Sequence, residues 1–298
     1  MSEAAPAAVA VVGAGLMGAQ IGCEYALGGH PVTFVARDEG RARERVGAAL
    51  DMARRHGLAS ASATREAAER IAYRGDCAGD APVELIVESL VEDRAVKREW
   101  LLAAAAWRPA ATLASNSSSI PLSELGELAG VSERLLATHY WNPPLLMALV
   151  EVLAGEAAEP GRLERVVAML RAIGKRPVML EREAPGLLWN RIQAAVLREA
   201  LWLVEQGVAT PAVIDEVMRD GLARRWRLTG PFETVSLGGA AVFDAVATNL
   251  FPVLSDAQAT SGFAPHLIDD PQRLRALRER RDAELAAELE RDRERPTG

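Results

Sequence analysis

Four side chains of this sequence have the types needed to move a proton on and off a hydroxyl group. The first pair is His139, in the segment His139-Tyr140-Trp141-Asn142-Pro143, and Glu151, twelve residues after the histidine. A histidine suits acid–base catalysis because its pKa lies near neutrality. A carboxylate on its other ring nitrogen would fix the tautomer and stabilise the imidazolium, so we expect Glu151 to orient His139.

The second pair is Ser118, in a polar segment that closes a predicted strand, and Asn190, at the start of a predicted helix. Hydroxyl and amide groups can hydrogen-bond a reacting oxygen as charge builds on it. We expect His139 to act as the base when a secondary alcohol is oxidised and as the acid in the reverse direction. The alternatives are that a histidine at a strand end beside aromatic residues is structural, and that Glu151 is a surface residue.

The segment Gly13-Ala14-Gly15-Leu16-Met17-Gly18 follows the apolar run 9–12 and precedes a helix-like stretch. A strand, G-x-G-x-x-G and a helix in this order are typical of dinucleotide-binding sites. Gly13 permits the tight turn, Gly15 lets the backbone approach a pyrophosphate, and Gly18 allows close packing. The helix N-terminus then offers free N–H groups to the phosphates. The predicted contacts are Gly13, Gly15, Leu16, Met17 and Gly18; a glycine-rich turn without a ligand is the alternative.

Short apolar segments alternate with helical segments in the first part of the chain. Strands are predicted at 9–12, 31–35, 85–87, 112–115, 135–138 and 177–180, with helices at 41–56 and 94–107 among those between them. This alternation predicts an α/β domain, a Rossmann-type doubly wound parallel sheet.

The pattern changes after Pro185-Gly186, where long helical segments begin and no convincing strand follows. We therefore predict a dinucleotide-binding domain over residues 1–184 and an all-α domain over 185–298, to which the family resemblance described below assigns substrate binding and dimerisation. The tail from residue 271 is rich in Arg and Glu at helical spacings, which predicts a solvated helix with ion pairs along it.

Composition limits the class of protein. The chain has 298 residues, 49% hydrophobic and 25% charged, as in soluble globular proteins, and its net charge of −7 argues against a nucleic-acid partner. No run approaches the roughly 18 apolar residues of a membrane span. Cys23 and Cys77 fit neither a metal site nor a disulfide framework, so we expect no metal and a cytoplasmic location.

Several spaced motifs resemble those of the 3-hydroxyacyl-CoA dehydrogenase family. Its S-N-T-S-S, H-F-x-N-P and P-G-F-x-x-N-R motifs resemble residues 115–119, 139–143 and 185–191, with Leu187 in place of the usual Phe. Its V-E-x-x-x-E-x-x-x-x-K pattern resembles residues 87–97. The resemblance covers nearly the whole chain, and the second domain is most similar to the lambda-crystallin and L-gulonate dehydrogenase branch.

The resemblance implies an NAD- or NADP-dependent oxidoreductase that interconverts a 3-hydroxyacyl thioester, on CoA or a carrier protein, with its 3-oxo form. It implies a homodimer and assigns the catalytic roles to His139, Glu151, Ser118 and Asn190. It also places a second set of residues near the cofactor: Glu92, Lys97, Asn116, Ser118 and Asn142. Two alternatives are a dehydrogenase of a small free 3-hydroxy acid and a non-catalytic protein, either crystallin-like or nucleotide-sensing.

Two regions depart from the family pattern. The end of the second strand reads Ala36-Arg37-Asp38, where NAD-specific domains place an acidic residue for the ribose 2′-hydroxyl. We therefore expect Arg37 to contact the cofactor and favour NADP slightly over NAD. The family's CoA-binding helix carries a Ser and a Lys, whereas residues 48–58 contain only Arg54, Arg55 and His56 as basic residues and no Ser.

Overall fold

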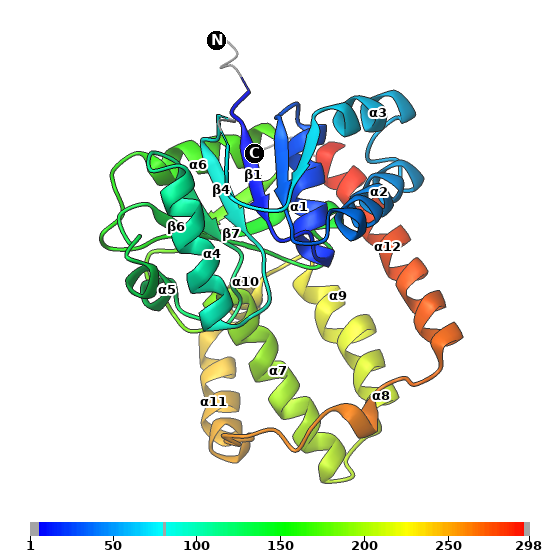
Figure 1. Ribbon diagram of the computed structural model, residues 1–298. Coiled ribbons are helices and arrows are strands. Elements are labelled where there is room, and N and C mark those ends of the chain that lie inside the picture. The colour runs from blue at the N-terminus through cyan, green and yellow to red at the C-terminus, as the bar shows by residue number, and fades with distance from the viewer. Residues whose placement is uncertain (1–5, 80–81, 295–298) are drawn as a thin grey trace. The chain divides into compact units, whose positions relative to one another are not determined.

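The computed structural model describes residues 6–79 and 82–294 (Figure 1). It contains two compact units: Met1–Leu188 together with Arg275–Gly298, and Trp189–Leu274. The predicted boundary at 184/185 lies close to this division. The final segment differs, because the structure groups residues from 275 onward with the first unit rather than the second.

The first unit is built on an eight-stranded sheet in the order β3-β2-β1-β4-β5-β6-β7-β8. Strand β1 lies inside the sheet between β2 and β4, and each of its residues is buried. The strands are β1 (Val9–Val12), β2 (Val32–Val35), β3 (Ile71–Arg74), β4 (Leu85–Glu88), β5 (Thr112–Ser115), β6 (Leu135–Tyr140), β7 (Leu149–Ala154) and β8 (Arg176–Met179).

Helices cover both faces of the sheet because its strands are apolar on both sides. Val9 and Val11 point to the face covered by α1, α2 and α6, whereas Ala10 and Val12 point to the face covered by α4 and α5. The helices of this unit, with the short turn η1, are α1 (Leu16–Leu27), α2 (Glu39–Arg55), α3 (Ala61–Glu69), α4 (Arg94–Trp107), α5 (Leu122–Ala129), η1 (Pro144–Leu146) and α6 (Arg162–Ala172).

The parallel sheet that the sequence predicts is present from β3 to β6, and the last two strands differ. Strand β7 pairs antiparallel with β6, and β8 runs parallel to β7. Only η1 and a few loop residues connect β6 to β7. A connection this short joins antiparallel strands, because a parallel pair needs a crossover of a dozen or more residues. Strands β3 and β7 were not among the predicted strands.

The second unit is helical, as predicted. Its helices are α7 (Leu187–Glu205), whose first two residues belong to the first unit, then α8 (Pro211–Glu216), η2 (Val217–Leu222), α9 (Ala223–Trp226), α10 (Pro231–Gly238), α11 (Ala240–Leu250), η3 (Phe251–Val253) and η4 (Ala264–His266). Thr234 and Ser255 are the only buried side chains among residues 189–274, all of which the structure describes.

Within the described residues, no single helix has the length and apolarity to cross a membrane. One sharply bent pair, Pro231–Gly238 with Ala240–Val253, meets those two criteria only when its halves are combined.

The last helix, α12 (Pro271–Glu294), was predicted to be a solvated helix with ion pairs along it. Most of its described side chains are exposed, and Arg281–Asp282 and Arg291–Glu288 form ion pairs, but a few of its residues are buried. Ala286 and Leu289 are buried, and Ala286 joins the hydrophobic core to which α1 and α2 contribute. Figure 1 shows α12 beside α2. Helical spacing of Arg and Glu predicts the helix itself, but a few small apolar residues decide where it packs.

Candidate active site

His139 and Glu151 are direct neighbours across two strands. In the antiparallel pairing of β6 and β7, His139 lies opposite Glu151, so their side chains leave the same face of the sheet. His139 Nδ1 is 2.7 Å from Glu151 Oε2, and the two side chains are only 4% and 1% exposed. The segment between His139 and Glu151 thus forms a hairpin, and this hairpin places the imidazole against the carboxylate.

Two further donors hold the Glu151 carboxylate. The backbone N–H of Leu188 donates to Oε1 at 2.8 Å, and Trp141 Nε1 donates to Oε2 at 3.3 Å. The preceding turn aims the Leu188 N–H, because Gly186 and Leu187 both have positive φ, 81° and 52°. Positive φ is unusual for leucine. The sequence reasoning did not find these two donors, although the Pro185-Gly186 pair signalled a special turn.

The other ring nitrogen of His139 faces Ser118. Ser118 Oγ lies 3.2 Å from His139 Nε2. With the Nδ1 proton directed to Glu151, Nε2 of the neutral ring accepts from the serine hydroxyl. A hydroxyl or carbonyl oxygen of a substrate could take the place of Ser118 Oγ beside His139 Nε2. It could then exchange a proton with His139 and accept a hydrogen bond from Ser118. Chemically, such an arrangement can act as a general acid–base pair with an adjacent donor for a developing oxyanion.

Glu92 organises the loop that carries Ser118. Its Oε1 accepts hydrogen bonds from the backbone N–H groups of Ser118, Ser119 and Ile120 and from the hydroxyls of Ser117 and Ser119. Burial would raise the pKa of Glu92, but these hydrogen bonds, with the nearby Lys97 charge, outweigh it and lower the pKa to about 2. The loop is thus tied to an ionised carboxylate.

Lys97 lies beneath this loop. Its ammonium is 2.7 Å from Glu88 Oε1 and 3.3 Å from Glu92 Oε2, and its side chain is 1% exposed. Glu88 in turn accepts from Ser115 Oγ at 2.6 Å. The sequence reasoning placed Glu92 and Lys97 near the cofactor; in the structure Lys97 is the buried counter-ion of two carboxylates and supports the site from inside.

Two asparagines lie at the carboxyl edge of the sheet. Asn116 Oδ1 accepts from the backbone N–H of Tyr140, and its Nδ2 is 3.4 Å from Ser89 Oγ, so this side chain links the ends of β4, β5 and β6. Asn142 follows β6 and precedes a cis peptide bond to Pro143. Because β1, β4, β5 and β6 run parallel, their carboxyl ends bring these residues and the glycine-rich loop to the same edge.

The glycine-rich loop fits a dinucleotide. Gly13 has φ 98°, which favours glycine, and a Cβ at Gly18 would lie 1.9 Å from the Gly13 carbonyl oxygen. A Cβ at Gly15 would meet nothing within 4 Å, so open space lies above this residue. Gly15 is the N-cap of α1 and offers no side chain, which leaves the first-turn N–H groups at Leu16 and Met17 available for a pyrophosphate.

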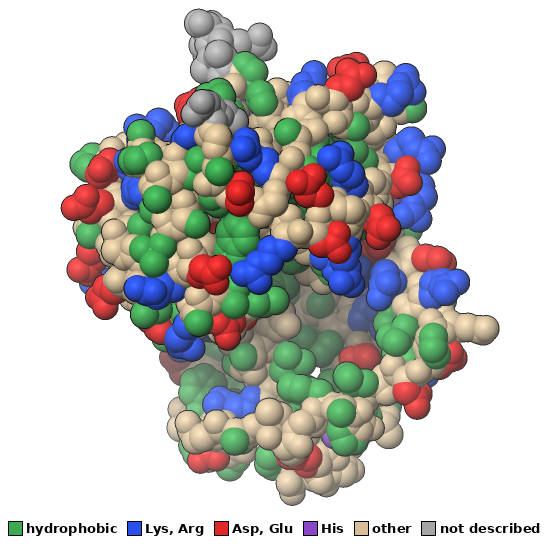
Figure 2. All heavy atoms as spheres, in the orientation of Figure 1, with side chains coloured by type: hydrophobic (Ala, Val, Ile, Leu, Met, Phe, Trp, Pro, Cys, Tyr) green, Lys and Arg blue, Asp and Glu red, His purple; other side chains and the backbone are tan. Residues whose placement is uncertain are grey.

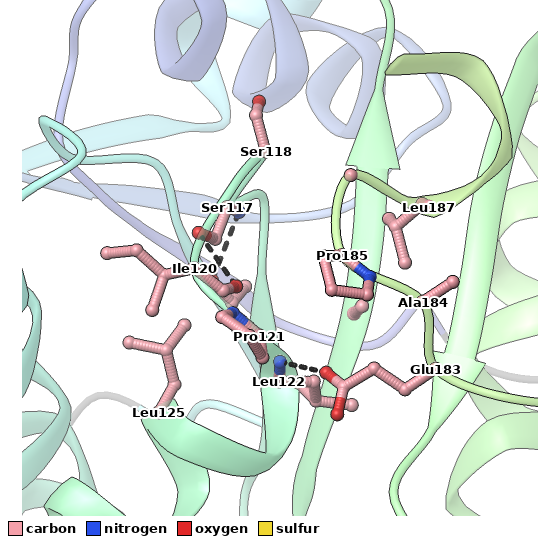
Figure 3. A pocket seen from close by; sticks show the side chains of 13 residues that line it. Ser117, Ser118, Ile120, Pro121, Leu122, Leu125, Glu183, Ala184, Pro185 and Leu187 are labelled. Carbon is pink, nitrogen blue, oxygen red and sulfur yellow. Dashed lines mark hydrogen bonds between the residues drawn. The ribbon is translucent and has the colours of Figure 1, made fainter. Parts of the chain in front are cut away.

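A small cavity of about 20 Å³ lies behind the Ser118 loop (Figure 3). Glu183 borders it and accepts hydrogen bonds from the N–H groups of Leu122 and Ser123. This carboxylate caps α5, whose own N-cap, Pro121, has no capping side chain. Ser118 points away from these residues (Figure 3), so the cavity belongs to the scaffold of the loop.

A larger pocket, of about 840 Å³, lies between α1, α2 and α12 and reaches Asn142 and Pro143. Basic side chains dominate its charged lining, with Glu279 and Asp282 as the acidic members. The basic residues are Arg45, Arg55, His56, Arg275, Arg278 and Arg281. Half of them come from α12, which the sequence reasoning had not connected to the site.

Asn190 is the fourth residue of α7 and lies in the second unit. The structure therefore brings together His139, Glu151 and Ser118 in the first unit, while the proximity of Asn190 to them remains a prediction.

Family models match almost all of the chain. The model described as the NAD binding domain of 3-hydroxyacyl-CoA dehydrogenase matches residues 8–184, and that of its C-terminal domain matches residues 186–276. The first domain is thus an NAD-binding domain.

Curated relatives include dehydrogenases of small free compounds. An L-carnitine dehydrogenase of Streptomyces griseus is 34% identical over 235 residues, 78% of this chain and 69% of that protein. A 5-formyl-3-hydroxy-2-methylpyridine 4-carboxylate 5-dehydrogenase of Mesorhizobium japonicum is 30% identical over 254 residues, 83% of this chain and 81% of that protein.

Solved structures that are similar to this chain are also dehydrogenases. A 5-formyl-3-hydroxy-2-methylpyridine 4-carboxylic acid 5-dehydrogenase, described as an NAD+-dependent dismutase, has a TM-score of 0.85 at 25% identity and covers 96% of this chain and 99% of its own. The (S)-3-hydroxybutyryl-CoA dehydrogenase of Ralstonia eutropha has a TM-score of 0.68 at 26% identity, with 74% and 78% covered. Fold, motifs and relatives agree that the chain is a dehydrogenase and belongs to the 3-hydroxyacyl-CoA dehydrogenase family.

Proposed function

We propose that this protein interconverts a 3-hydroxy acid or acyl compound with its 3-oxo form, and that His139 is the acid–base residue. The observation that carries this proposal is the chain of contacts from the buried Glu151 through the buried His139 to the exposed Ser118, at the same sheet edge as the glycine-rich loop. A crystallin-like or nucleotide-sensing protein would not require this arrangement.

Each residue has a distinct part in the proposed reaction. A nicotinamide cofactor held at the glycine-rich loop would supply the hydride chemistry. His139 Nε2 takes the hydroxyl proton during oxidation, and Glu151 stabilises the imidazolium that results. In the reducing direction the same Nε2–H returns the proton to the substrate oxygen. Ser118 donates to that oxygen while it carries negative charge, and we place Asn190 in the same role.

The relatives favour a free acid as the substrate. The L-carnitine dehydrogenase and the pyridine carboxylate dehydrogenase are named for small free compounds, and both match more than three quarters of this chain. We therefore rank a small 3-hydroxy acid first, ahead of the thioester that the motifs alone had favoured.

A 3-hydroxyacyl thioester, on CoA or a carrier protein, is the second candidate. The basic pocket of about 840 Å³ beside Asn142 favours it, because a carboxylate alone needs much less space and arginines are suited to phosphate groups. In this candidate Arg55 and the arginines of α12 take the place of the absent Ser and Lys.

The deciding experiment measures cofactor oxidation with free 3-oxo acids, acetoacetyl-CoA and its pantetheine thioester analogue. Turnover with a free acid alone supports the first candidate, and turnover with thioesters supports the second. Activity with pantetheine equal to that with CoA would exclude phosphate recognition by the basic pocket. Absence of turnover with every member of the panel would contradict both candidates.

The variant His139→Gln tests the acid–base role. We expect kcat to fall by about 10² to 10⁴ while cofactor binding is retained. His30→Gln is a matched control, because His30 is also buried in the first unit but binds the carbonyl of Ala7 at the opposite edge of the sheet. An unchanged kcat in His139→Gln would disprove the proposed role.

We also propose a homodimer formed through the helical unit. Large apolar side chains of this unit lie at the surface, with Phe232 86% and Leu237 79% exposed. Hydrophobic side chains are visible over its helices (Figure 2). A helical unit with only two buried side chains, Thr234 and Ser255, needs another surface to cover it. Light scattering that gave a monomer mass at micromolar concentration would contradict this proposal.

A further inference from the structure

A second pocket near the glycine-rich loop lies beyond the carboxyl end of β2. It has a volume of about 360 Å³ and includes Gly13 and Gly15 in its lining. Three of its four charged lining residues are arginines, namely Arg37, Arg41 and Arg45, and the fourth is Asp38. In domains of this fold, the end of the second strand is where the adenosine ribose binds. The excess of positive charge therefore lies where the 2′-position of the ribose would be.

The carboxylate that selects NAD is missing here. Ala36 directly follows β2, and its backbone N–H donates to the carbonyl of Arg74, so the sheet holds Ala36 in the position that an acidic residue would need. A methyl side chain cannot accept a hydrogen bond from the ribose 2′-hydroxyl. It also exerts no repulsion on a phosphate at that position.

The Asp38 carboxylate already accepts a hydrogen bond within its own segment of the chain. Its Oδ1 accepts from the backbone N–H of Arg41 at 2.9 Å and caps the N-terminus of α2. Binding a ribose hydroxyl instead would leave that end of the helix uncapped. Asp38 is thus a structural carboxylate and a poor substitute for the missing ribose ligand.

The arginines are placed to bind an anion. Arg37 makes an ion pair with Glu99 at 3.4 Å, but both side chains are about 70% exposed (70% and 68%), so this contact is easily exchanged. Its guanidinium lies 5.7 Å from the centre of the Trp100 ring, which is also in the pocket lining. Arg41 lies in the first turn of α2, one turn before Arg45 on the same face.

Arg45 has a different contact. It donates to the carbonyl of Ala14 at 3.0 Å and so braces the glycine-rich loop. Basic side chains gather over α2 in Figure 2, with acidic ones between them. Arg37 and Arg41 are the other two arginines of the pocket lining.

We propose that Arg37 and Arg41 bind the 2′-phosphate of NADP(H), so that this NAD-type domain takes the phosphorylated cofactor in preference to NAD(H). Guanidinium groups bind phosphate through paired, charge-assisted hydrogen bonds. The inference rests on the cofactor site of the proposed function, but not on the identity of the substrate.

The test is a fluorescence or calorimetric titration of the intact protein with NADPH and NADH in the absence of substrate. We expect NADPH to bind at least about tenfold more tightly. The double variant Arg37→Ala/Arg41→Ala should lose this preference, with NADH affinity changed by less than about threefold. The fragment 2′,5′-ADP should compete with NADPH more strongly than 5′-AMP in the wild type and equally in the double variant.

Arg43→Ala is the matched control, because Arg43 is an arginine of the same helix that lies over Tyr73 and is not in the pocket lining. Its cofactor preference should equal that of the wild type. Ala36→Asp should shift the preference towards NADH. Equal affinity of the wild type for both cofactors, or an equal loss of both in the double variant, would overturn the inference. A protein that binds NADPH selectively but turns over no substrate would contradict the proposed function and leave this inference intact.

Discussion

Replacement of Glu151 by glutamine isolates the contribution of one buried charge. The carboxylate accepts from His139 Nδ1 at 2.7 Å, from the Leu188 N–H at 2.8 Å and from Trp141 Nε1 at 3.3 Å. Glutamine has almost the same shape but only one acceptor oxygen, so at least one of the three donors loses its partner. The His139 ring is also no longer forced to keep its proton on Nδ1.

The expected magnitude follows from the charge that develops on His139 during the reaction. The imidazolium of His139 and the carboxylate of Glu151 can be treated as two unit charges about 4 Å apart. At an effective dielectric constant near 20, such charges attract each other by about 4 kcal/mol. Each 1.36 kcal/mol of barrier changes the rate about tenfold, so kcat should fall by about 10² to 10³. Stability should fall by about 1.5 to 3 kcal/mol, the contribution of a charge-assisted hydrogen bond.

The assay is the steady-state rate of nicotinamide oxidation or reduction, with cofactor affinity and urea unfolding measured on the same samples. Glu159→Gln is the control, because Glu159 makes a hydrogen-bonded ion pair with Arg162 away from the histidine. A kcat within about threefold of the wild type would refute the reasoning. So would a loss explained entirely by weaker cofactor binding.

Three further predictions follow from other contacts. Gly15→Ala should leave the free energy of unfolding unchanged or slightly higher, because φ at Gly15 is −72° and the new Cβ meets nothing within 4 Å, but it should weaken cofactor binding at least about tenfold. Gly18→Ala should instead destabilise the fold, because its Cβ would lie 1.9 Å from the Gly13 carbonyl oxygen. Lys175→Met should cost about 3 to 5 kcal/mol in urea unfolding, because it leaves buried Glu24 unpaired and releases the carbonyls of Pro144 and Met147. The pKa of Glu92 is lowered from 4.5 to about 2, so the stability that its ionised form contributes is fully present above pH 4.5 and is lost as the pH falls towards 2. The wild type should therefore lose more stability than Glu92→Gln between pH 5 and pH 3, by about 1 to 2 kcal/mol after allowance for the partial exposure of Glu92.

Each of these predictions has an outcome that contradicts it. Normal cofactor affinity in Gly15→Ala would show that the backbone there does not approach the pyrophosphate. For the buried pair, the double variant Glu24→Gln/Lys175→Met should recover part of the lost stability, and no recovery would argue against the ion pair. For Glu92, an acid-unfolding midpoint equal to that of the wild type would contradict the role of its hydrogen bonds.

The sequence was sufficient for features that depend on neighbouring residues. The first strand, the glycine turn and the start of α1 were predicted correctly because each glycine has a local reason, such as φ 98° at Gly13. The helical nature of the second unit was also readable, because long helical segments begin after Pro185-Gly186 and no convincing strand follows them. Motif spacing was enough to pair His139 with Glu151.

Only the tertiary structure decided how distant segments meet. The reversal of β7, the burial of Lys97 between two carboxylates and the Leu188 N–H on Glu151 each join residues that are not adjacent in the sequence. The docking of α12 is of the same kind, because the buried Ala286 has no distinguishing pattern among charged neighbours. Periodicity reports which face of an element is apolar, whereas the partner of that face depends on the packing of the whole chain. The sequence therefore determined the chemistry available to this dehydrogenase, and the fold decided which groups hold that chemistry in place.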